Sequence, residues 1–312
     1  MSIEASIIVV NWRVRDLLRA CLQSIRDQAG LAMDRLEVIV VDNDSRDGSV
    51  EMVRAEFPEV RLIANADNPG FGKANNQAMP WCNGRFIVLL NPDTVLLDAA
   101  IQKMIRRMDQ RPDVAVMGCR LLNADGSLQR WTGGAFPRAL NLANHYLFLD
   151  QILPKAMRPM SLYLDHDPAD EIDVDWVSGA FMILRTNMLK GKLFNPDFFM
   201  YGEDMELCHR LKLAGHKVVY SPAASIIHYQ GASMKQQQGD VLLASLKGPR
   251  QFYKQMRGSG AVWIYDFFTV VGFALRWFLY SAMNWLRPGR GYASRADSSV
   301  DLMRRAWRIA TG

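Results

Sequence analysis

Short apolar runs alternate with stretches of helical periodicity through the first 90 residues. The apolar runs have the length of buried strands, which are predicted over residues 5–10, 36–41, 60–63 and 86–90. The segments between them repeat apolar residues at helical spacing and predict helices over residues 16–28, 50–57 and around 75–76. Strands separated by helix-length segments indicate βαβ units, so the predicted fold class is α/β with a mostly parallel sheet.

The pattern changes after Val114. Asn123-Ala124-Asp125-Gly126 predicts a turn between two further segments, which favours a hairpin added to the sheet. A later apolar run, Ile226-Ile227, predicts a strand that ends at His228. The sequence contains no internal repeat or low-complexity tract.

Acidic residues follow two of the predicted strands, at the sheet edge where α/β folds bind ligands. Asn91-Pro92-Asp93 follows the fourth predicted strand, and Asp42 and Asp44 follow the second. A carboxylate at this edge can accept the imide N–H of uracil or thymine. Helix capping is the alternative role, but Ser45 or Asp47 can supply the cap. We therefore predict that Asp42 contacts the base of a nucleotide.

The segment 68–76 follows the third predicted strand and is rich in Asn and Gly. Its backbone N–H groups and the helix that begins there suit phosphate binding. The sequence Gly70-Phe71-Gly72 partly matches a dinucleotide fingerprint, but it lacks the third Gly and does not follow the first strand. A nicotinamide-dependent enzyme is therefore not expected.

Glu203-Asp204 forms a second acidic motif, far from the first along the chain. Two acids before a helix can simply stabilise its N-terminus. That alternative does not explain the preceding Phe198–Gly202, which predicts an apolar wall beside the acids. Such a wall can raise the pKa of a carboxyl and make it a general base. One acid holding a metal on a phosphate and another accepting a proton from a hydroxyl describe group transfer from a nucleotide-activated donor.

Composition and charge separate the end of the chain from the rest. The 312 residues, 49% hydrophobic, suit one large domain with an appendage. The apolar run near the N-terminus is too short for a secretory signal, and four scattered Cys without a CxxC pair favour a reducing cytoplasm. Residues 241–312 hold 11 Lys+Arg against 3 Asp+Glu, whereas the whole chain has a net charge of only +5. We expect two regions, residues 1–240 and 241–312.

A long apolar helix rich in Trp and Phe is predicted over residues 261–286. Its polar residues fall within an arc of about 80°. We call them the polar stripe, which consists of Asp266, Thr269, Arg276, Tyr280, Asn284 and Arg287. Such a helix is typical of the membrane interface, where the stripe would face the headgroups and the flanking Arg residues would contact anionic lipid.

Other placements of this helix stay open. It is long enough to span a bilayer, although two charges in its middle argue against a lone span. Packing on the rest of the protein or on a second subunit is the soluble alternative. Nucleic acid is not an expected partner, because the basic residues flank an aromatic helix.

Six motifs occur in a specific order, although each is weak alone. They are Ser6–Trp12, Val41–Ser49, Asn68–Asn76, Asn91-Pro92-Asp93, Gly202-Glu203-Asp204 and His228–Gly231. With these motifs, about residues 3–235 resemble the family 2 glycosyltransferases, which have the GT-A fold. Within that family, the chain looks most like the bacterial rhamnosyltransferase-like branch that builds surface polysaccharide.

The resemblance implies a metal and donor site at the strand ends. Asp93 would bind Mg²⁺ or Mn²⁺ on the donor diphosphate, and His228 would close the metal site, although a structural role for a lone His remains open. Asn91 stands where relatives often have a further acid. The implied contacts with the nucleotide sugar are Val10, Asn11, Asp42, Asp44, Asn68, Gly70, Lys73, Asn76, Asn91 and Asp93.

The resemblance also implies the catalytic and acceptor residues. Asp204 would deprotonate the acceptor hydroxyl, which gives direct displacement with inversion at the anomeric carbon. Glu203 would hold hydroxyls of the acceptor or the donor. Trp176 and Gly179 would lie beneath the acceptor.

The expected protein is an inverting, metal-dependent glycosyltransferase, peripheral or monotopic at the cytoplasmic face of the bacterial inner membrane. It would move rhamnose from dTDP-rhamnose to a lipid-linked saccharide, and a homo-oligomer is compatible with the sequence. A UDP-hexose or N-acetylhexosamine transferase of the same fold is the close alternative. A sugar nucleotidyltransferase is disfavoured, because Asn11-Trp12-Arg13 replaces the Gly-rich loop that it needs. A non-catalytic membrane scaffold is the third alternative.

Overall fold

The chain divides into two compact units. The first comprises Met1–Gly134 and Tyr163–Val241, and the second comprises Ala135–Leu162 and Leu242–Gly312. The structure is a computed structural model that describes residues 2–154, 161–164, 166–189, 191–229 and 238–311. A single division at residue 240 therefore differs from the observed units, because the segment Ala135–Leu162 belongs with the C-terminal helices. A catalytic domain followed by a membrane-associating extension stays a prediction.

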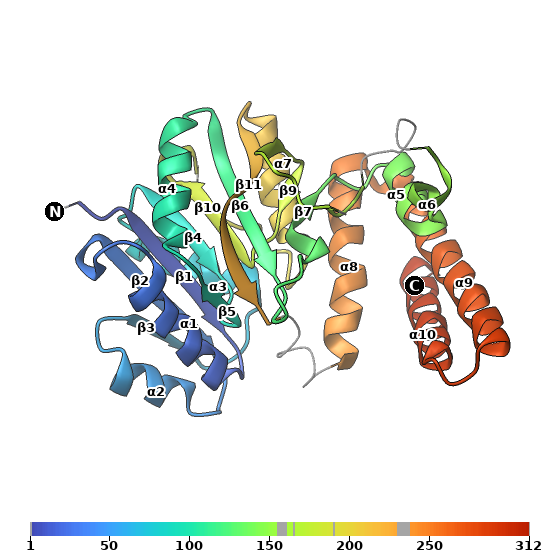
Figure 1. Cartoon of the computed structure of the whole chain (residues 1–312), viewed down its shortest axis with the longest axis horizontal. Helices are drawn as coiled ribbons and strands as arrows, with labels where there is room; N and C mark the ends of the chain where they lie inside the picture. Colours follow the sequence, from blue (N-terminus) through green and yellow to red (C-terminus); the bar gives the residue numbers. More distant parts are fainter. Residues whose placement is uncertain (1, 155–160, 165, 190, 230–237, 312) are drawn as a thin grey trace. The chain divides into compact units, whose positions relative to one another are not determined.

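Among the described residues, nine strands form the sheet of the first unit in the order β3-β2-β1-β4-β10-β6-β11-β5, and β8 pairs with β11 (Figure 1). Their bounds are β1 Ala5–Asn11, β2 Leu36–Asn43, β3 Arg61–Asn65, β4 Phe86–Leu90, β5 Thr94–Leu96, β6 Val114–Leu122, β8 Ile172–Asp173, β10 Phe181–Arg185 and β11 Lys217–His228. Strands β7 (Gly133–Gly134) and β9 (Trp176–Val177) form a separate ribbon. Strands β1 to β4 are parallel, as the alternating pattern predicts, and β10 is antiparallel to β4.

Helices pack on this sheet, and the middle residues of its central strands β1, β2 and β4 are apolar and buried. The helices of the first unit are α1 Arg15–Gln28, α2 Ser49–Glu56, α3 Phe71–Ala78, α4 Ala100–Gln110 and α7 Glu203–Leu213. Ile7 and Val9 of β1 pack in one core with residues of α1 and α4, such as Leu18 and Met104. Every residue of β4 is buried.

Strand register gathers the predicted site residues at one edge of the sheet. Asn11 at the end of β1 lies beside Asp42 in β2. His228 at the end of β11 pairs with Thr94 in β5, so it lies next to Asp93. Parallel strands therefore bring the first two positions together, and an antiparallel pair brings the last two together.

The predicted turn at Asn123–Gly126 is present, but no long hairpin strand follows it. Gly126 N–H donates to Asn123 O at 2.9 Å, and Leu122 and Leu128 form an isolated antiparallel bridge. Immediately after the bridge, the chain turns inward, and the Gln129 side chain is buried among the strand ends.

The second unit is helical. Its helices are α5 Ala139–Leu147, α6 Leu149–Ile152, α8 Gln238–Arg257, α9 Val262–Leu286 and α10 Tyr292–Thr311. The Tyr146 ring of α5 packs against Gly272 of α9, where an added Cβ would lie 2.4 Å from the ring. Close helix packing therefore requires Gly at this position. Among the described residues, Ser259–Leu286 is the one helical segment long and apolar enough to cross a membrane, judged by length and composition only.

Two charged residues of the polar stripe, Asp266 and Arg276, contact other helices of their unit, whereas Arg287 at the end of the stripe is exposed. Asp266 forms an ion pair with Arg250 of α8 at 2.7 Å. Arg276 donates to the backbone oxygens of His145 and Tyr146 at 3.0 and 3.2 Å. These polar groups find partners inside the unit, because a charge on a packed helix is stabilised there by carbonyls and opposite charges.

Another side of α9 carries exposed apolar side chains, and we call it the aromatic stripe. Its large side chains are exposed and fall within an arc of about 100° at helical spacing. They are Trp263, Phe267, Trp277, Phe278 and Trp285.

Candidate active site

A buried network around Asp42 joins the loops that follow β1 and β2. Asp42 Oδ1 accepts from Asn11 Nδ2 at 2.7 Å and from the Ser45 hydroxyl at 2.6 Å, and Oδ2 accepts the Ser45 N–H at 3.0 Å. The Ser45 hydroxyl accepts the Arg13 N–H at 2.9 Å. Asp42 is only 2% exposed, and Val10 and Asn11 are buried beside it. The observed role of Asp42 is to hold these loops, and its contact with a nucleotide base stays a prediction.

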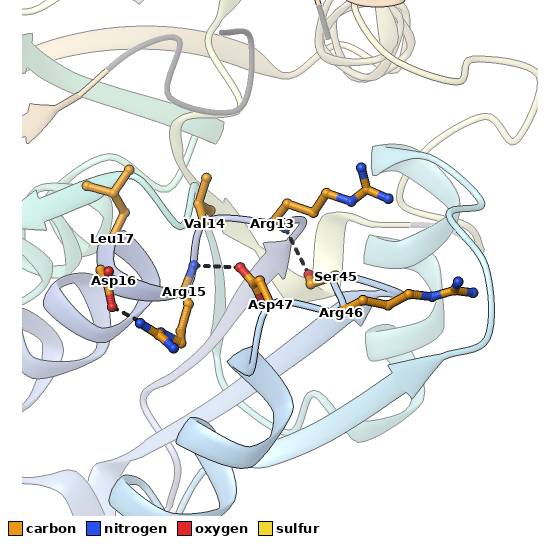
Figure 2. A pocket seen from close by; sticks show the side chains of 8 residues that line it. All are labelled: Arg13, Val14, Arg15, Asp16, Leu17, Ser45, Arg46 and Asp47. Atoms are coloured by element: carbon orange, nitrogen blue, oxygen red, sulfur yellow. Dashed lines mark hydrogen bonds and ion pairs between the residues drawn. The ribbon is translucent and has the colours of Figure 1, made fainter. Parts of the chain in front are cut away.

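The loops themselves carry exposed charge and unusual backbone angles. Arg13, Asp44 and Arg46 adopt left-handed φ angles of 55°, 56° and 53°, which are strained for residues with a Cβ. Asp44 forms an ion pair with Arg46 at 2.8 Å. A hollow of about 540 Å³ is lined by residues 13–17 and 45–47, and Figure 2 shows Arg13 and Arg46 projecting from its two loops. This volume suits a small-molecule site, and the guanidinium groups suit an anion.

The start of α3 is tied to the segment that precedes α7. Gly70 has a φ of 92°, and a Cβ there would lie 2.5 Å from Phe199 O. The Phe71 N–H donates to the same carbonyl at 3.0 Å. The Asn76 side chain donates to Phe194 O at 2.8 Å and accepts the Phe194 N–H at 2.9 Å. The predicted phosphate loop is therefore hydrogen-bonded to the aromatic segment that precedes the second acidic motif.

These bonds change how the predicted donor contacts of this segment are interpreted. The Asn76 amide binds backbone, and Asn68 Oδ1 accepts from Asn43 Nδ2 and from the Gly70 N–H at 3.1 and 3.0 Å. Both amides have structural partners. Lys73 is exposed in the first turn of α3, so its ammonium is the charged group of this segment that a diphosphate can reach.

Asp93 and His228 lie together at the ends of their strands. The Tyr229 N–H donates to Asp93 O at 2.8 Å, which fixes the two backbones. His228 Nε2 lies 3.3 Å from Asp93 Oδ1 and 3.4 Å from Asn91 Nδ2. The Asp93 and His228 side chains are 9% and 10% exposed. Gln230 and Gly231, which follow in the same motif, lie outside the described residues.

This donor set fits a cation that binds together with a diphosphate. In the part of the chain that the structure describes, no three His, Cys, Asp or Glu side chains gather into a metal site. Asp93 and His228 would provide one oxygen and one nitrogen ligand. Mg²⁺ and similar ions are commonly held by one or two carboxylates plus substrate phosphates and water. The residues are therefore compatible with Mg²⁺ or Mn²⁺ shared with a nucleotide.

Glu203 and Asp204 form the first turn of α7. Burial raises the pKa of Glu203, and the charge of Asp204 raises it further. Burial also raises the pKa of Asp204, against the hydrogen bonds from the Met205 and Gly179 N–H groups. Among the described residues, Glu203 Oε2 has no hydrogen-bond partner, while Asp204 is partly exposed. An acid that is accessible and has a raised pKa can accept a proton near neutral pH.

Tyr201 marks the place where the two acidic motifs meet. Burial raises its pKa to about 12, and the charges of Glu203, Asp93 and Asp204 add to the rise. All three acids therefore lie near enough to the phenol for their charges to act on it. The structure therefore brings together the strand-end acid and the α7 acids, which lie far apart along the chain.

Gly179 lies between these motifs. Its N–H faces the Asp204 carboxyl, and the carbonyl of the next residue, Ala180, accepts the Asn91 N–H at 3.0 Å. A Cβ at Gly179 would lie 3.4 Å from the Phe71 ring, tight enough that the ring would have to move. The loop thus contacts α3, α7 and the end of β4 together.

Trp176 lies beneath the protein surface and does not form it. Its ring is 4% exposed and packs edge-on against Tyr163, which in turn contacts Trp131 at a centroid distance of 4.2 Å. Trp131 is 48% exposed and is the most exposed of these three rings. No sequence signal singled out Trp131 or Gln129, because neither belongs to a motif.

Comparisons with known proteins identify the family of this chain. The model of the family described as "Glycosyl transferase family 2" matches residues 6–186. The N-acetylglucosaminyl-diphospho-decaprenol L-rhamnosyltransferase of Mycobacterium tuberculosis is 26% identical over 218 residues, which are 65% of this chain and 70% of the relative. Rhamnosyltransferase WbbL of Escherichia coli (strain K12) is 29% identical over 233 residues, 72% of this chain and 82% of the relative.

Solved structures show the same fold. The mannosyltransferase PcManGT from Pyrobaculum calidifontis, solved in complex with GDP-Man and Mn²⁺, has a TM-score of 0.61 and 15% identity, and the match covers 100% of this chain and 88% of that one. The expected GT-A-like fold with C-terminal helices is confirmed. The family match covers more than half of the chain and therefore favours a glycosyltransferase over a sugar nucleotidyltransferase. The chain is a glycosyltransferase that belongs to glycosyl transferase family 2, and it is similar to rhamnosyltransferases of that family.

Proposed function

We propose that this glycosyltransferase moves rhamnose from dTDP-rhamnose to a lipid-linked saccharide, with inversion at the anomeric carbon. The names of the mycobacterial and E. coli relatives, both rhamnosyltransferases, support rhamnose as the sugar. The mycobacterial name also specifies a decaprenol-linked acceptor, which supports a lipid-linked acceptor here. Transfer of a hexose or N-acetylhexosamine from UDP is the alternative.

The observation that carries this proposal is that the segment Gly179–Ala180 links the two acidic motifs: the Gly179 N–H binds the Asp204 carboxyl, and the Ala180 carbonyl accepts the N–H of Asn91, two residues before Asp93, at 3.0 Å. The two acids have different surroundings. Asp93 lies beside an imidazole, whereas Asp204 accepts backbone hydrogen bonds and is partly exposed. Different environments let two carboxyls take different tasks, because each environment sets which form of the acid is favoured.

In the proposed reaction, Asp204 takes the proton of the acceptor hydroxyl as that oxygen forms a bond to the anomeric carbon. The bond between this carbon and the diphosphate oxygen breaks, and its electron pair leaves with dTDP. Attack opposite to the leaving group inverts the sugar. The raised pKa of Asp204 suits the task, since a base with a pKa nearer neutrality accepts a proton more strongly. Glu203 would bind a sugar hydroxyl through its unpartnered oxygen.

Asp93 and His228 would hold Mg²⁺ or Mn²⁺, which when bound offsets the charge that develops on the departing diphosphate. The presence of Mn²⁺ in the fold relative PcManGT supports a divalent cation. Lys73 and the arginines of the hollow would contribute further positive charge toward the donor.

We place the protein at the cytoplasmic face of the bacterial inner membrane, with the aromatic stripe of α9 in the lipid interface. Its five residues are 45–83% exposed. On the neighbouring α10, Arg304 and Arg308 flank the exposed Trp307 beside Val270 of α9. Aromatic rings next to arginines suit the boundary between acyl chains and anionic headgroups.

Nucleotide binding by the purified full-length protein tests the donor site. In calorimetric titrations with dTDP, UDP and GDP, we expect dTDP with Mn²⁺ to bind most tightly. Asp93→Ala should lose the part of the affinity that depends on Mn²⁺. Asp98→Ala is the matched control, because Asp98 is an exposed acid that pairs only at the surface with Lys103.

Two outcomes would change the proposal. Preferential binding of UDP would favour the UDP-sugar alternative. Equal losses of nucleotide affinity in Asp93→Ala and Asp204→Asn would contradict the separate roles of the two acids. Release of dTDP from dTDP-rhamnose upon addition of a lipid-linked saccharide, with NMR of the product anomer, then tests transfer and inversion.

A further inference from the structure

The Gln129 side chain contacts His228 at two points. Gln129 Nε2 lies 2.6 Å from the backbone oxygen of His228, and Gln129 Oε1 lies 2.9 Å from His228 Nδ1. Gln129 is 3% exposed. A buried amide with both ends on one residue constrains that residue more than either contact alone.

The two contacts fix which way the amide points. A backbone oxygen only accepts hydrogen bonds, so the group that faces His228 O must be the NH₂ of Gln129. The amide oxygen must then face Nδ1. An amide oxygen also only accepts, so Nδ1 must carry the hydrogen. The hydrogen-bond network itself therefore assigns this tautomer.

The tautomer determines what the other ring nitrogen can do. In a neutral imidazole with a hydrogen on Nδ1, Nε2 presents a lone pair. Nε2 lies 3.3 Å from Asp93 Oδ1 and 3.4 Å from Asn91 Nδ2. A lone pair and a carboxylate oxygen at this separation repel each other unless a positive charge lies between them. A proton on Nε2 would supply that charge as an ion pair with Asp93, and a divalent cation would supply it while taking both atoms as ligands.

We propose that Gln129 is a positioning residue, which holds His228 in the Nδ1–H tautomer and so directs the Nε2 lone pair to the cation shared with Asp93. This inference rests on the proposed metal-dependent function. Metal-bound His residues commonly donate their second N–H to an oxygen that fixes the ring orientation. Here the oxygen comes from an amide that no sequence motif marks.

The surrounding backbone shows why this position is fixed before any ligand arrives. The Gln129 N–H donates to Leu121 O at 2.9 Å, and its carbonyl accepts the Thr132 hydroxyl at 2.6 Å. On the other side, β11 and β5 hold His228 opposite Thr94. Both backbones are anchored independently, so the amide acts on the ring orientation and on its hydrogen.

The test compares Gln129→Leu with Gln129→Glu in the full-length protein. Glu places an oxygen against Nδ1 in either protonation state, whereas Leu removes it. The first readout is long-range ¹H–¹⁵N NMR of the metal-free protein labelled at its five His residues, with His228→Ala identifying the signal. The second is the affinity for Mn²⁺ in the presence of dTDP, measured by electron paramagnetic resonance.

We expect the wild type and Gln129→Glu to show a hydrogen on Nδ1 of His228. Gln129→Leu should lose this preference and bind Mn²⁺ about 10- to 100-fold more weakly, the usual effect of losing an outer-shell partner. In the His228→Ala background, Gln129→Leu should cause no further loss, because Gln129 acts through the ring.

An Nδ1 without a hydrogen in the wild-type protein would overturn the inference, and so would an added loss in the double variant. The wild-type spectrum gives this answer even if a variant fails to fold. Unchanged Mn²⁺ affinity in His228→Ala would overturn the cation-directing role and the metal assignment of the proposed function. The nucleotide titrations would still test the donor site, so the two failures are distinguishable.

Discussion

Two regions of this molecule depart from the usual distribution of polar and apolar groups, in opposite directions. At the start of α7, the acids Glu203 and Asp204 are held where burial raises the pKa of both. Along α9, the charged side chains have partners, such as Arg250 for Asp266, while large rings such as Trp285 are exposed. The first region buries acidic side chains, and the second exposes large apolar rings.

Each departure has a free-energy cost that folding alone does not explain. Buried polar atoms are usually hydrogen-bonded, and large exposed apolar patches usually mark interaction sites. An acid kept in an apolar place gains strength as a base, while exposed rings gain free energy only when a partner covers them. The comparison therefore separates a region for chemistry from a region for attachment.

The largest expected effect is at Asp204. Asp204→Asn should lower turnover by about 10²–10⁴, because an amide cannot take the proton of the acceptor hydroxyl. Nucleotide affinity should change little, since the donor contacts lie on other elements. Single-turnover transfer and calorimetry with dTDP would measure the two effects separately.

Glu206→Gln is the matched control for that variant. Glu206 lies on the same helix but pairs with Arg210 at 3.2 Å, and it should retain full turnover. A comparable loss of turnover in both variants would mean that the helix, and not the acid at its start, is sensitive to substitution.

The next effect concerns attachment. Trp277→Gln and Phe278→Gln should each weaken binding to vesicles containing phosphatidylglycerol by about 10-fold, as expected for losing about 1.5 kcal/mol or more of buried aromatic surface. High salt should weaken wild-type binding only in part, because ring burial is not screened. Vesicle co-sedimentation at several lipid concentrations gives the partition coefficients.

Two controls sharpen this test. Trp81 is a matched control for Trp277, because the two rings are 46% and 45% exposed. Trp81 lies in the first unit and outside the aromatic stripe, so Trp81→Gln should leave vesicle binding unchanged. Arg276→Gln removes a cation of the polar stripe that binds carbonyls of α5. If it weakens vesicle binding as much as the ring substitutions do, the polar stripe and not the aromatic stripe faces the lipid.

Local patterns were sufficient to predict the first four strands, the helices between them and the long helix near the C-terminus. The positions of the strand ends predicted that Asn11, Asp42 and Asp93 lie near one another, because the carboxyl ends of parallel strands meet at one edge of the sheet. The direction in which α9 faces could not be predicted in this way. Periodicity shows that its polar residues share one side, but whether that side meets water, lipid or protein depends on the partners that α5 and α8 supply.

The same limit applies inside the site. Sequence analysis predicted Asn76 and Trp176 as ligand contacts, whereas the Asn76 amide binds Phe194 backbone and the Trp176 ring is buried. Gln129 escaped notice because its importance arises only from a hydrogen bond to a residue on a distant strand. Their roles toward a ligand stay predictions.

The smallest expected effect is the pH dependence of stability that the buried Glu203 causes in the first unit. Burial raises the pKa of Glu203, so the folded state binds this proton more tightly than the unfolded chain. The stabilisation from the bound proton is therefore present at low pH and is lost as pH rises from the ordinary carboxyl pKa through the raised one. Glu203→Gln keeps a neutral side chain at every pH, and it should be more stable than wild type by about 1 kcal/mol at pH 8.

Urea unfolding of wild type and Glu203→Gln across a pH series measures this difference, which should shrink toward pH 5 as wild-type Glu203 becomes protonated. Glu206→Gln should show no such gain, because it removes one partner of a partly buried ion pair. A Glu203→Gln variant that is less stable at pH 8 than at pH 5, relative to wild type, would mean that the Glu203 charge is stabilised by groups around it. In that case only α9 would depart from the usual distribution of polar and apolar groups, because the exposure of its rings does not depend on Glu203.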